Sequence, residues 1–153
     1  MDNLTEERYV FFRFCAGDIQ ECKKTLALLD DATNDLIRLA LIKSAIISYA
    51  RPFSGNQPQY REAGKWRLDA SFVPLAHIET HRRAIEYRNK LIAHTDIPHR
   101  KPQLLNAGLD WAIGHDAPSY DDYFEFSAAL NALSLELFNV LCAKIKNYER
   151  ESL

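Results

Sequence analysis

Basic residues and histidines are concentrated in one stretch of the sequence, between His81 and Lys101. The stretch holds six arginines and lysines against two carboxylates, whereas the whole chain has a formal net charge of −2. Its cations are Arg82, Arg83, Arg88, Lys90, Arg100 and Lys101, and its histidines are His81, His94 and His99. A charged stretch is usually only a solvent-exposed face of a protein. However, this chain has no overall positive charge, so a nucleic acid could bind it only at a local basic patch of this kind.

RNA cleavage is the chemistry that Arg88, Asn89 and His94 could perform together. When the 2′-hydroxyl of RNA attacks the neighbouring phosphorus, one proton is removed, another is given to the leaving 5′-oxygen, and charge develops on the phosphate. A histidine that titrates near neutrality can transfer both protons. An arginine can hold the phosphate with its forked guanidinium, and Asn89 can orient either group. This scheme requires no metal ion and no cofactor.

The spacing of Arg88 and His94, with five residues between them, resembles the Arg-x(4–6)-His motif of the HEPN superfamily. Residues 87–96, and more faintly residues 49–52, are similar to its abortive-infection phage-resistance branch. The resemblance implies that Arg88 and His94 are catalytic. It further implies that the substrate is bound or oriented by Asn89, Tyr87, Lys90, Arg51 and His99.

The same resemblance implies an architecture and a biological role. We expect one antiparallel four-helix bundle over residues 1–153, with two long connecting loops, that forms a homodimer. The expected activity is that of a metal-independent endoribonuclease in phage defence or a toxin–antitoxin stress response. RNA would be the substrate, and an antitoxin protein a possible partner. The alternative is a non-catalytic dimeric module of the same fold that binds RNA, a nucleotide or a partner protein.

Helix geometry sets a condition on the proposed catalytic pair. Six residues along an ideal α-helix rotate by roughly 600°, which leaves Arg88 and His94 about 120° apart. The two side chains can therefore converge only if the helix unwinds near His94, or if a second subunit contributes across a two-fold axis. The resemblance implies the second arrangement, because in HEPN nucleases two motifs face each other across a two-fold dimer and form one composite cleft.

Each motif residue also has an ordinary structural interpretation. Arg88 could pair with Glu86 or Asp96, Asn89 could be a buried polar residue, and His94 could interact with the negative end of a helix dipole. A purely structural helical dimer is the third alternative. His77 and His81, four residues apart, share a helical face, but their order does not match the zinc-protease motif, and we expect no metal site.

Composition is that of one globular, helical domain. The chain has 153 residues, 47% of them hydrophobic, and only five glycines, too few for the many turns of an all-β fold. Cys15, Cys22 and Cys142 have no metal-binding spacing, and an odd number of cysteines behind a polar N-terminus predicts reduced, buried thiols in the cytoplasm. No segment is expected to interact with a membrane.

Apolar periodicity predicts four helices. They cover about residues 5–29, residue 36 until Pro52 ends the second helix, residues 74–93, and a last helix that opens at Ser119, with Ala16-Gly17-Asp18 as a weak point in the first. The second helix is expected to be the most buried, with a wide apolar face formed by Leu36, Leu39, Ile42, Ile46 and Tyr49 and, beside them, Ile37, Leu41 and Ala45. The last helix is expected to bury a stripe of Tyr123, Phe126, Leu130, Leu133, Leu137, Val140, Leu141 and Ile145. The inward positions of the third helix are expected to include Leu75, Ile78, Ile85 and Ile92. Residues 53–72 and 106–118 read as loops, and the second of these could hold a short pair of strands.

Overall fold

The computed structural model describes residues 3–55, 66–92, 103–106, 111–114 and 120–151. Most of these residues are helical, as the sequence predicts for an all-α protein. The long helices are α1 (Asn3–Ala27), α2 (Asp35–Ala50) and α5 (Tyr120–Glu151). The shorter helix α3 (Ile78–Glu86) continues directly into a π-helical turn, η5 (Tyr87–Ile92).

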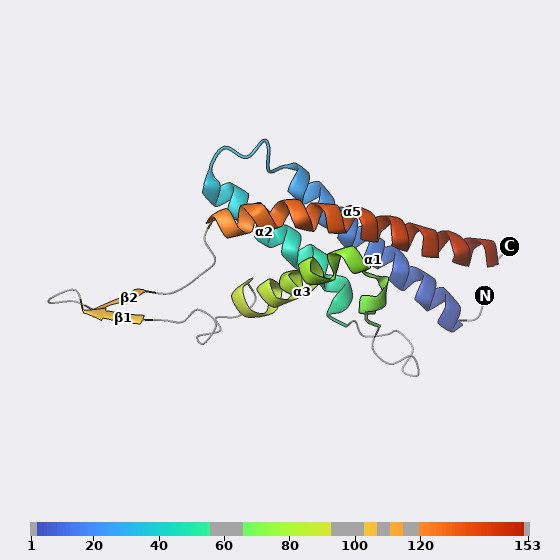
Figure 1. Cartoon of the computed structure of the whole chain (residues 1–153). Coiled ribbons are helices and arrows are strands. Elements are labelled where there is room, and N and C mark those ends of the chain that lie inside the picture. The colour runs from blue at the N-terminus through green and yellow to red at the C-terminus, as the bar shows by residue number, and fades with distance from the viewer. Residues whose placement is uncertain (1–2, 56–65, 93–102, 107–110, 115–119, 152–153) are drawn as a thin grey trace.

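Helices α1 and α5 lie antiparallel along most of their length, so the start of α1 and the end of α5 lie close together (Figure 1). Their register is fixed at two points: Tyr9 Oη donates to Glu149 Oε1 at 2.9 Å, and Cys22 Sγ lies 3.2 Å from Ser134 Oγ. Helix α1 is unbroken at Gly17, contrary to the weak point expected there. Between them the two helices bury one apolar stripe each, and most of the core lies where these stripes meet α2.

Helix α2 begins where the sequence predicts, because Asn34 caps it. The Asn34 side chain accepts a hydrogen bond from the Ile37 N–H at 3.0 Å, which satisfies one free donor of the first turn. The helix ends at Ala50, and Pro52 falls in the 3-10 turn η1 (Arg51–Phe53) that follows. Full burial in α2 begins at Ile42, whereas Leu36 and Ile37 in the first turn are exposed. The expected burial of the whole apolar face is therefore wrong at its start.

The third helix has the expected position but not the expected inward face. Of the expected inward residues, Leu75 is 89% exposed, Ile78 is 45% exposed and Ile85 is partly buried, while the side chain of Ile92 lies outside the described part of the structure. Ala84 and Tyr87 are buried instead. The reason is that the segment begins as a 3-10 turn, η4 (Leu75–His77), and ends as a π turn. Residues rotate by different angles in these turns than in an α-helix, so a 3.6-residue period projected through them selects the wrong positions.

A short strand pair lies between the third helix and α5. Strand β1 (Gln103–Asn106) pairs antiparallel with β2 (Trp111–Gly114), and in Figure 1 this hairpin lies apart from the helices. The expected strand pair is therefore present, although β1 begins before residue 106, where the sequence places the start of the irregular segment.

Helix α5 is apolar enough over Asp121–Arg150 to pass, by length and composition alone, a test for a membrane-spanning helix. Some of the apolar side chains of α5 are buried in the core. The buried side chains Leu130, Leu133, Leu137 and Leu141 recur at helical spacing and pack against the other helices. Others belong to the outward face of α5, where Leu135 and Val140 are exposed.

Candidate functional site

The π-helical turn η5 contains the first half of the proposed motif, and its first residue is anchored in the core. Tyr87 is buried, and its ring centroid lies 5.3 Å from that of Tyr123 and 5.1 Å from that of Phe126. Its hydroxyl accepts hydrogen bonds from Arg83 Nε at 2.9 Å and Nη2 at 2.7 Å. In this position Tyr87 can orient the turn, but its ring cannot stack on a substrate.

Arg88 and Asn89 follow at the surface of the turn. Arg88 is partly buried, Asn89 is exposed, and Arg88 Nη1 donates to Asn89 Oδ1 at 2.8 Å. This bond restricts the guanidinium while leaving most of its N–H donors for another acceptor. A guanidinium held in this way is suited to a planar, bidentate contact with a phosphate.

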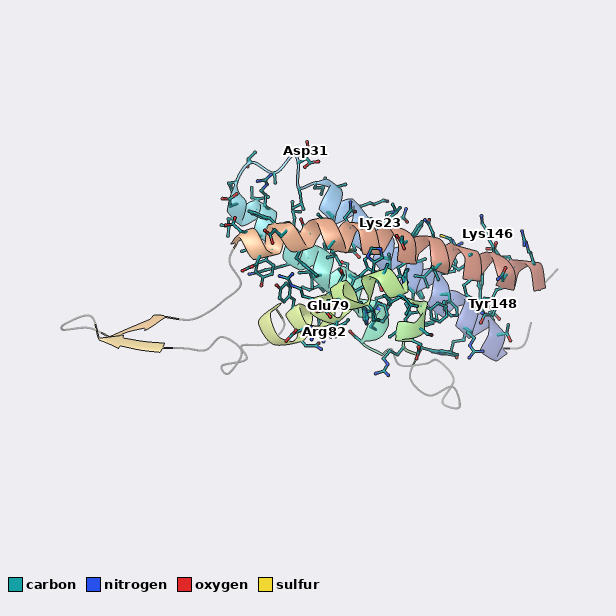
Figure 2. The ribbon with its side chains drawn as sticks, viewed as in Figure 1. Lys23, Asp31, Glu79, Arg82, Lys146 and Tyr148 are labelled. Atoms are coloured by element: carbon teal, nitrogen blue, oxygen red, sulfur yellow. The ribbon has the colours of Figure 1, made fainter. Side chains whose placement is uncertain are left out.

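The neighbouring cations differ in how far they are neutralised. Arg82 forms a two-point contact with Glu79, at 2.6 and 3.0 Å, and its other nitrogen lies 4.0 Å from Glu86. Arg83 is committed to Tyr87, and its guanidinium carbon also lies 5.2 Å from the ring centroid of Phe126. Figure 2 labels the Glu79 and Arg82 side chains, which lie together on α3. The local positive charge expected from the sequence is therefore lower at Arg82 than residue counting suggests.

Arg51 is occupied elsewhere. Its Nη1 lies 2.6 Å from Glu21 Oε2 and 3.2 Å from Asp18 Oδ1, both on α1. Burial raises the pKa of Asp18, and Arg51 partly offsets this effect. The contact ties the end of α2 to the middle of α1. The structure thus gives this proposed substrate ligand an ionic role between helices and does not bring it to the Arg88–Asn89 pair.

A polar pair that sequence reasoning did not single out joins α2 to α3. Tyr49 is fully buried, and its hydroxyl lies 2.8 Å from Nδ1 of His81. The His81 ring packs edge-on against Phe53 with centroids 4.5 Å apart, and burial lowers the pKa of His81. The sequence could have indicated such a pair, because Tyr49 lies on the apolar stripe of α2 and a buried tyrosine hydroxyl usually has a hydrogen-bond partner.

The remaining predicted residues are only partly described. The backbone of Lys90 lies in η5, whereas His94 and His99 lie outside the described residues. His77 and His81 do not share a ligand: His77 Nε2 lies 3.1 Å from Glu136 Oε1, and His81 binds Tyr49. Within residues 3–55, 66–92 and 120–151 no group of three metal-ligating side chains comes together.

A separate hollow of about 320 Å³ lies between α1 and α5. Its lining includes Arg13, Phe138, Cys142 and Lys146, and none of its lining residues belongs to η5. Cys142 is partly accessible there, in contrast to the buried Cys15 and Cys22. The prediction of buried thiols is thus confirmed for two cysteines and wrong for Cys142, which lies at the rim of the helix pair.

Comparison of the chain with protein-family models, with curated proteins and with solved structures found no match. The resemblance to the HEPN superfamily therefore rests on the motif residues and the helix order read from the sequence.

Proposed function

We propose that this protein is a HEPN-like, metal-independent endoribonuclease that acts as a homodimer. The observation that carries the proposal is the hydrogen bond between Arg88 and Asn89 on a π-helical turn. Turns of this kind are rare and frequently mark functional sites. The bundle of α1, α2, α3 with η5, and α5 would be the HEPN four-helix bundle, and its biological setting would be phage defence or a toxin–antitoxin response.

In the proposed mechanism Arg88 binds the phosphate and stabilises the additional negative charge of the transition state. Asn89 orients Arg88, and Tyr87 with Arg83 fixes the turn from the core. His94 removes the proton of the 2′-hydroxyl and returns a proton to the leaving 5′-oxygen. Lys90 and His99 would contact the RNA backbone, and an antitoxin could inhibit the enzyme by covering this surface.

The proposal includes a dimer, because the spacing of the motif calls for either an unwound helix end near His94 or a second subunit. At their sequence spacing Arg88 and His94 would lie on different faces of an ideal α-helix. Because η5 is a π turn and His94 lies outside the described residues, the composite cleft of two motifs about a two-fold axis is part of the proposal. Sedimentation of the purified protein at micromolar concentration should show more than one chain per particle. A strictly monomeric mass would contradict the composite cleft.

The direct test is cleavage of single-stranded RNA in the presence of EDTA. The products should carry 2′,3′-cyclic phosphate and 5′-hydroxyl ends, and RNA with a 2′-O-methyl group at the cut site should remain intact. His94→Ala should lower the rate by roughly 10²- to 10⁴-fold, the usual contribution of general acid–base catalysis. His115→Ala, a histidine outside the motif, is the matched control and should leave the rate unchanged.

Binding of RNA or of a protein partner without cleavage would instead support the non-catalytic module. If His94→Ala unfolds a protein that never showed activity, the motif residue is structural. Circular dichroism of wild type and variant separates this outcome from loss of catalysis, because a catalytic variant should keep its helical signal and its melting temperature.

A further inference from the structure

The outward face of α5 carries a narrow stripe of exposed residues that the core does not use. In its middle section the stripe consists of small or uncharged side chains, Ala128, Ala132, Leu135, Asn139 and Ala143, all of them exposed. Their spacing of three or four residues places them within roughly 80° of one another around the helix. We call the surface that these residues and their charged neighbours form the α5 stripe.

Charged residues extend the α5 stripe at both ends, with opposite signs. Asp121 and Glu125 lie toward its start, Lys146 and Arg150 toward its end, and all four are exposed. Among the described residues, no ion pair uses any of these four side chains. The stripe is therefore acidic at one end, basic at the other, and neutral between them.

The charges are symmetric about the midpoint of the stripe, between Leu135 and Glu136. Glu125 lies ten residues before Leu135 and Lys146 lies ten residues after Glu136. Asp121 and Arg150 lie fourteen residues from the same two positions. When two such helices pack antiparallel about a two-fold axis at this midpoint, each acidic residue meets a basic residue of the other copy.

From this relationship we propose that the α5 stripe binds the α5 stripe of a second copy of this chain, antiparallel. Glu125 would face Lys146, Asp121 would face Arg150, and Ala128 would face Ala143 across the axis. The alanines allow the two helix backbones to approach closely. Close approach favours this pair, because its stripes have few large side chains that could interdigitate. A two-fold contact between identical surfaces requires the stripe to be complementary to itself, as its charges are. Binding to an unrelated partner would not require this self-complementarity.

Glu136 is the charged residue nearest the axis, and its carboxylate is already engaged. Its Oε1 lies 3.1 Å from Nε2 of His77, so this side chain is turned toward η4. Tyr123 and Phe126, which hold Tyr87 of the proposed site, are buried on the opposite side of α5. The α5 contact is thus distinct from a dimer built around η5, and a protein that uses both surfaces would contain at least four chains.

Charge reversal with rescue tests the inference. Glu125→Lys or Lys146→Glu alone would place like charges opposite each other at two symmetric points. Each should weaken self-association by about ten- to a hundredfold, measured by sedimentation over a concentration series. The double variant Glu125→Lys/Lys146→Glu restores opposite charges and should recover the wild-type association constant. Asp31→Lys and Lys24→Glu, exposed and outside the stripe, are the matched controls.

Three results would overturn the α5 contact: a monomeric wild type, single variants that associate as wild type does, or a double variant without recovery. In a parallel pairing Glu125 would meet Glu125, so neither reversal would weaken it and the double variant would show no rescue. RNA cleavage is measured separately, because loss of the α5 contact should not change the chemistry at Arg88. An inactive protein that shows the rescue would contradict the proposed nuclease and support the α5 contact.

Discussion

The hydroxyl of Tyr49 lies 2.8 Å from Nδ1 of His81, and this contact connects α2 to α3 inside the protein. Tyr49 is fully buried and the His81 ring is partly buried, edge-on to both Tyr49 and Phe53. Since a neutral imidazole has one donor and one acceptor nitrogen, Nδ1 accepts the phenolic proton in the Nε2-protonated tautomer. The pair supplies a polar link between the buried face of α2 and α3.

Replacing Tyr49 with phenylalanine should destabilise the protein through this link. The variant keeps the ring and loses the hydroxyl, which leaves Nδ1 of a partly buried histidine without its partner. We expect the free energy of unfolding to fall by about 1–2 kcal/mol, a decrease in melting temperature of roughly 2–8 °C for a domain of this size. Denaturant titration measures the first and calorimetry the second. An unchanged stability would show that water replaces the hydroxyl at no cost.

The same histidine should make stability depend on pH. Burial lowers the pKa of His81 in the folded protein, so the unfolded chain binds a proton more readily as pH falls below the ordinary histidine pKa of about 6.5. The stabilising contribution is therefore present above that pH and is lost as pH falls from there through the lowered pKa. His81→Gln should flatten the decline in stability between about pH 7 and pH 5. Equal slopes for wild type and variant would contradict the assignment to His81.

The fold could be predicted from the sequence wherever an α-helical period persists. In α5 the predicted stripe and the buried residues agree from Tyr123 to Ile145, except for the exposed Val140 and the buried Ser134. The third helix differs because its backbone changes from 3-10 to α to π within eighteen residues, from Leu75 to Ile92. A single period cannot follow these changes, and propensities do not signal a π turn.

Side-chain partners at the candidate site were harder to predict than its position. Arg51 pairs with Asp18 and Glu21, which lie 33 and 30 residues before it, and local spacing carries no information about such contacts. The resemblance implied that Tyr87 binds or orients the substrate, yet its ring packs into the core beside Tyr123 of α5. The hydrogen bond between Arg88 and Asn89 joins sequence neighbours, so an orienting role for Asn89 could be reasoned from the sequence alone.

Thiol labelling should distinguish the three cysteines. Burial raises the pKa of Cys15 to about 12 and that of Cys22 to about 11, so neither forms a reactive thiolate near neutral pH. Cys142 is partly accessible in the hollow between α1 and α5. A thiol reagent such as DTNB should therefore modify one cysteine quickly in the folded protein and all three in denaturant. Cys142→Ser should abolish the fast phase, and a fast phase that survives this substitution would show that α1 opens readily.

A double-mutant cycle on RNA cleavage should show whether Asn89 acts through Arg88. If the 2.8 Å hydrogen bond positions the guanidinium, Asn89→Ala should slow cleavage by about three- to tenfold, the equivalent of one lost hydrogen bond. Arg88→Ala should cost considerably more, on the order of 10²-fold, because the transition-state charge loses its stabilising group. In the Arg88→Ala background, Asn89→Ala should then have no further effect.

The matched variants make this cycle specific. Arg88→Lys keeps the charge but loses the planar fork, and it should restore little activity. Arg67→Ala removes an exposed arginine outside the motif and should leave the rate unchanged. Asn89→Asp keeps an acceptor for Arg88 but adds a negative charge beside the phosphate, so it should raise the KM for RNA. Additive losses for Arg88→Ala and Asn89→Ala would mean that Asn89 contacts the RNA itself, and equal activity in all the variants would place catalysis elsewhere.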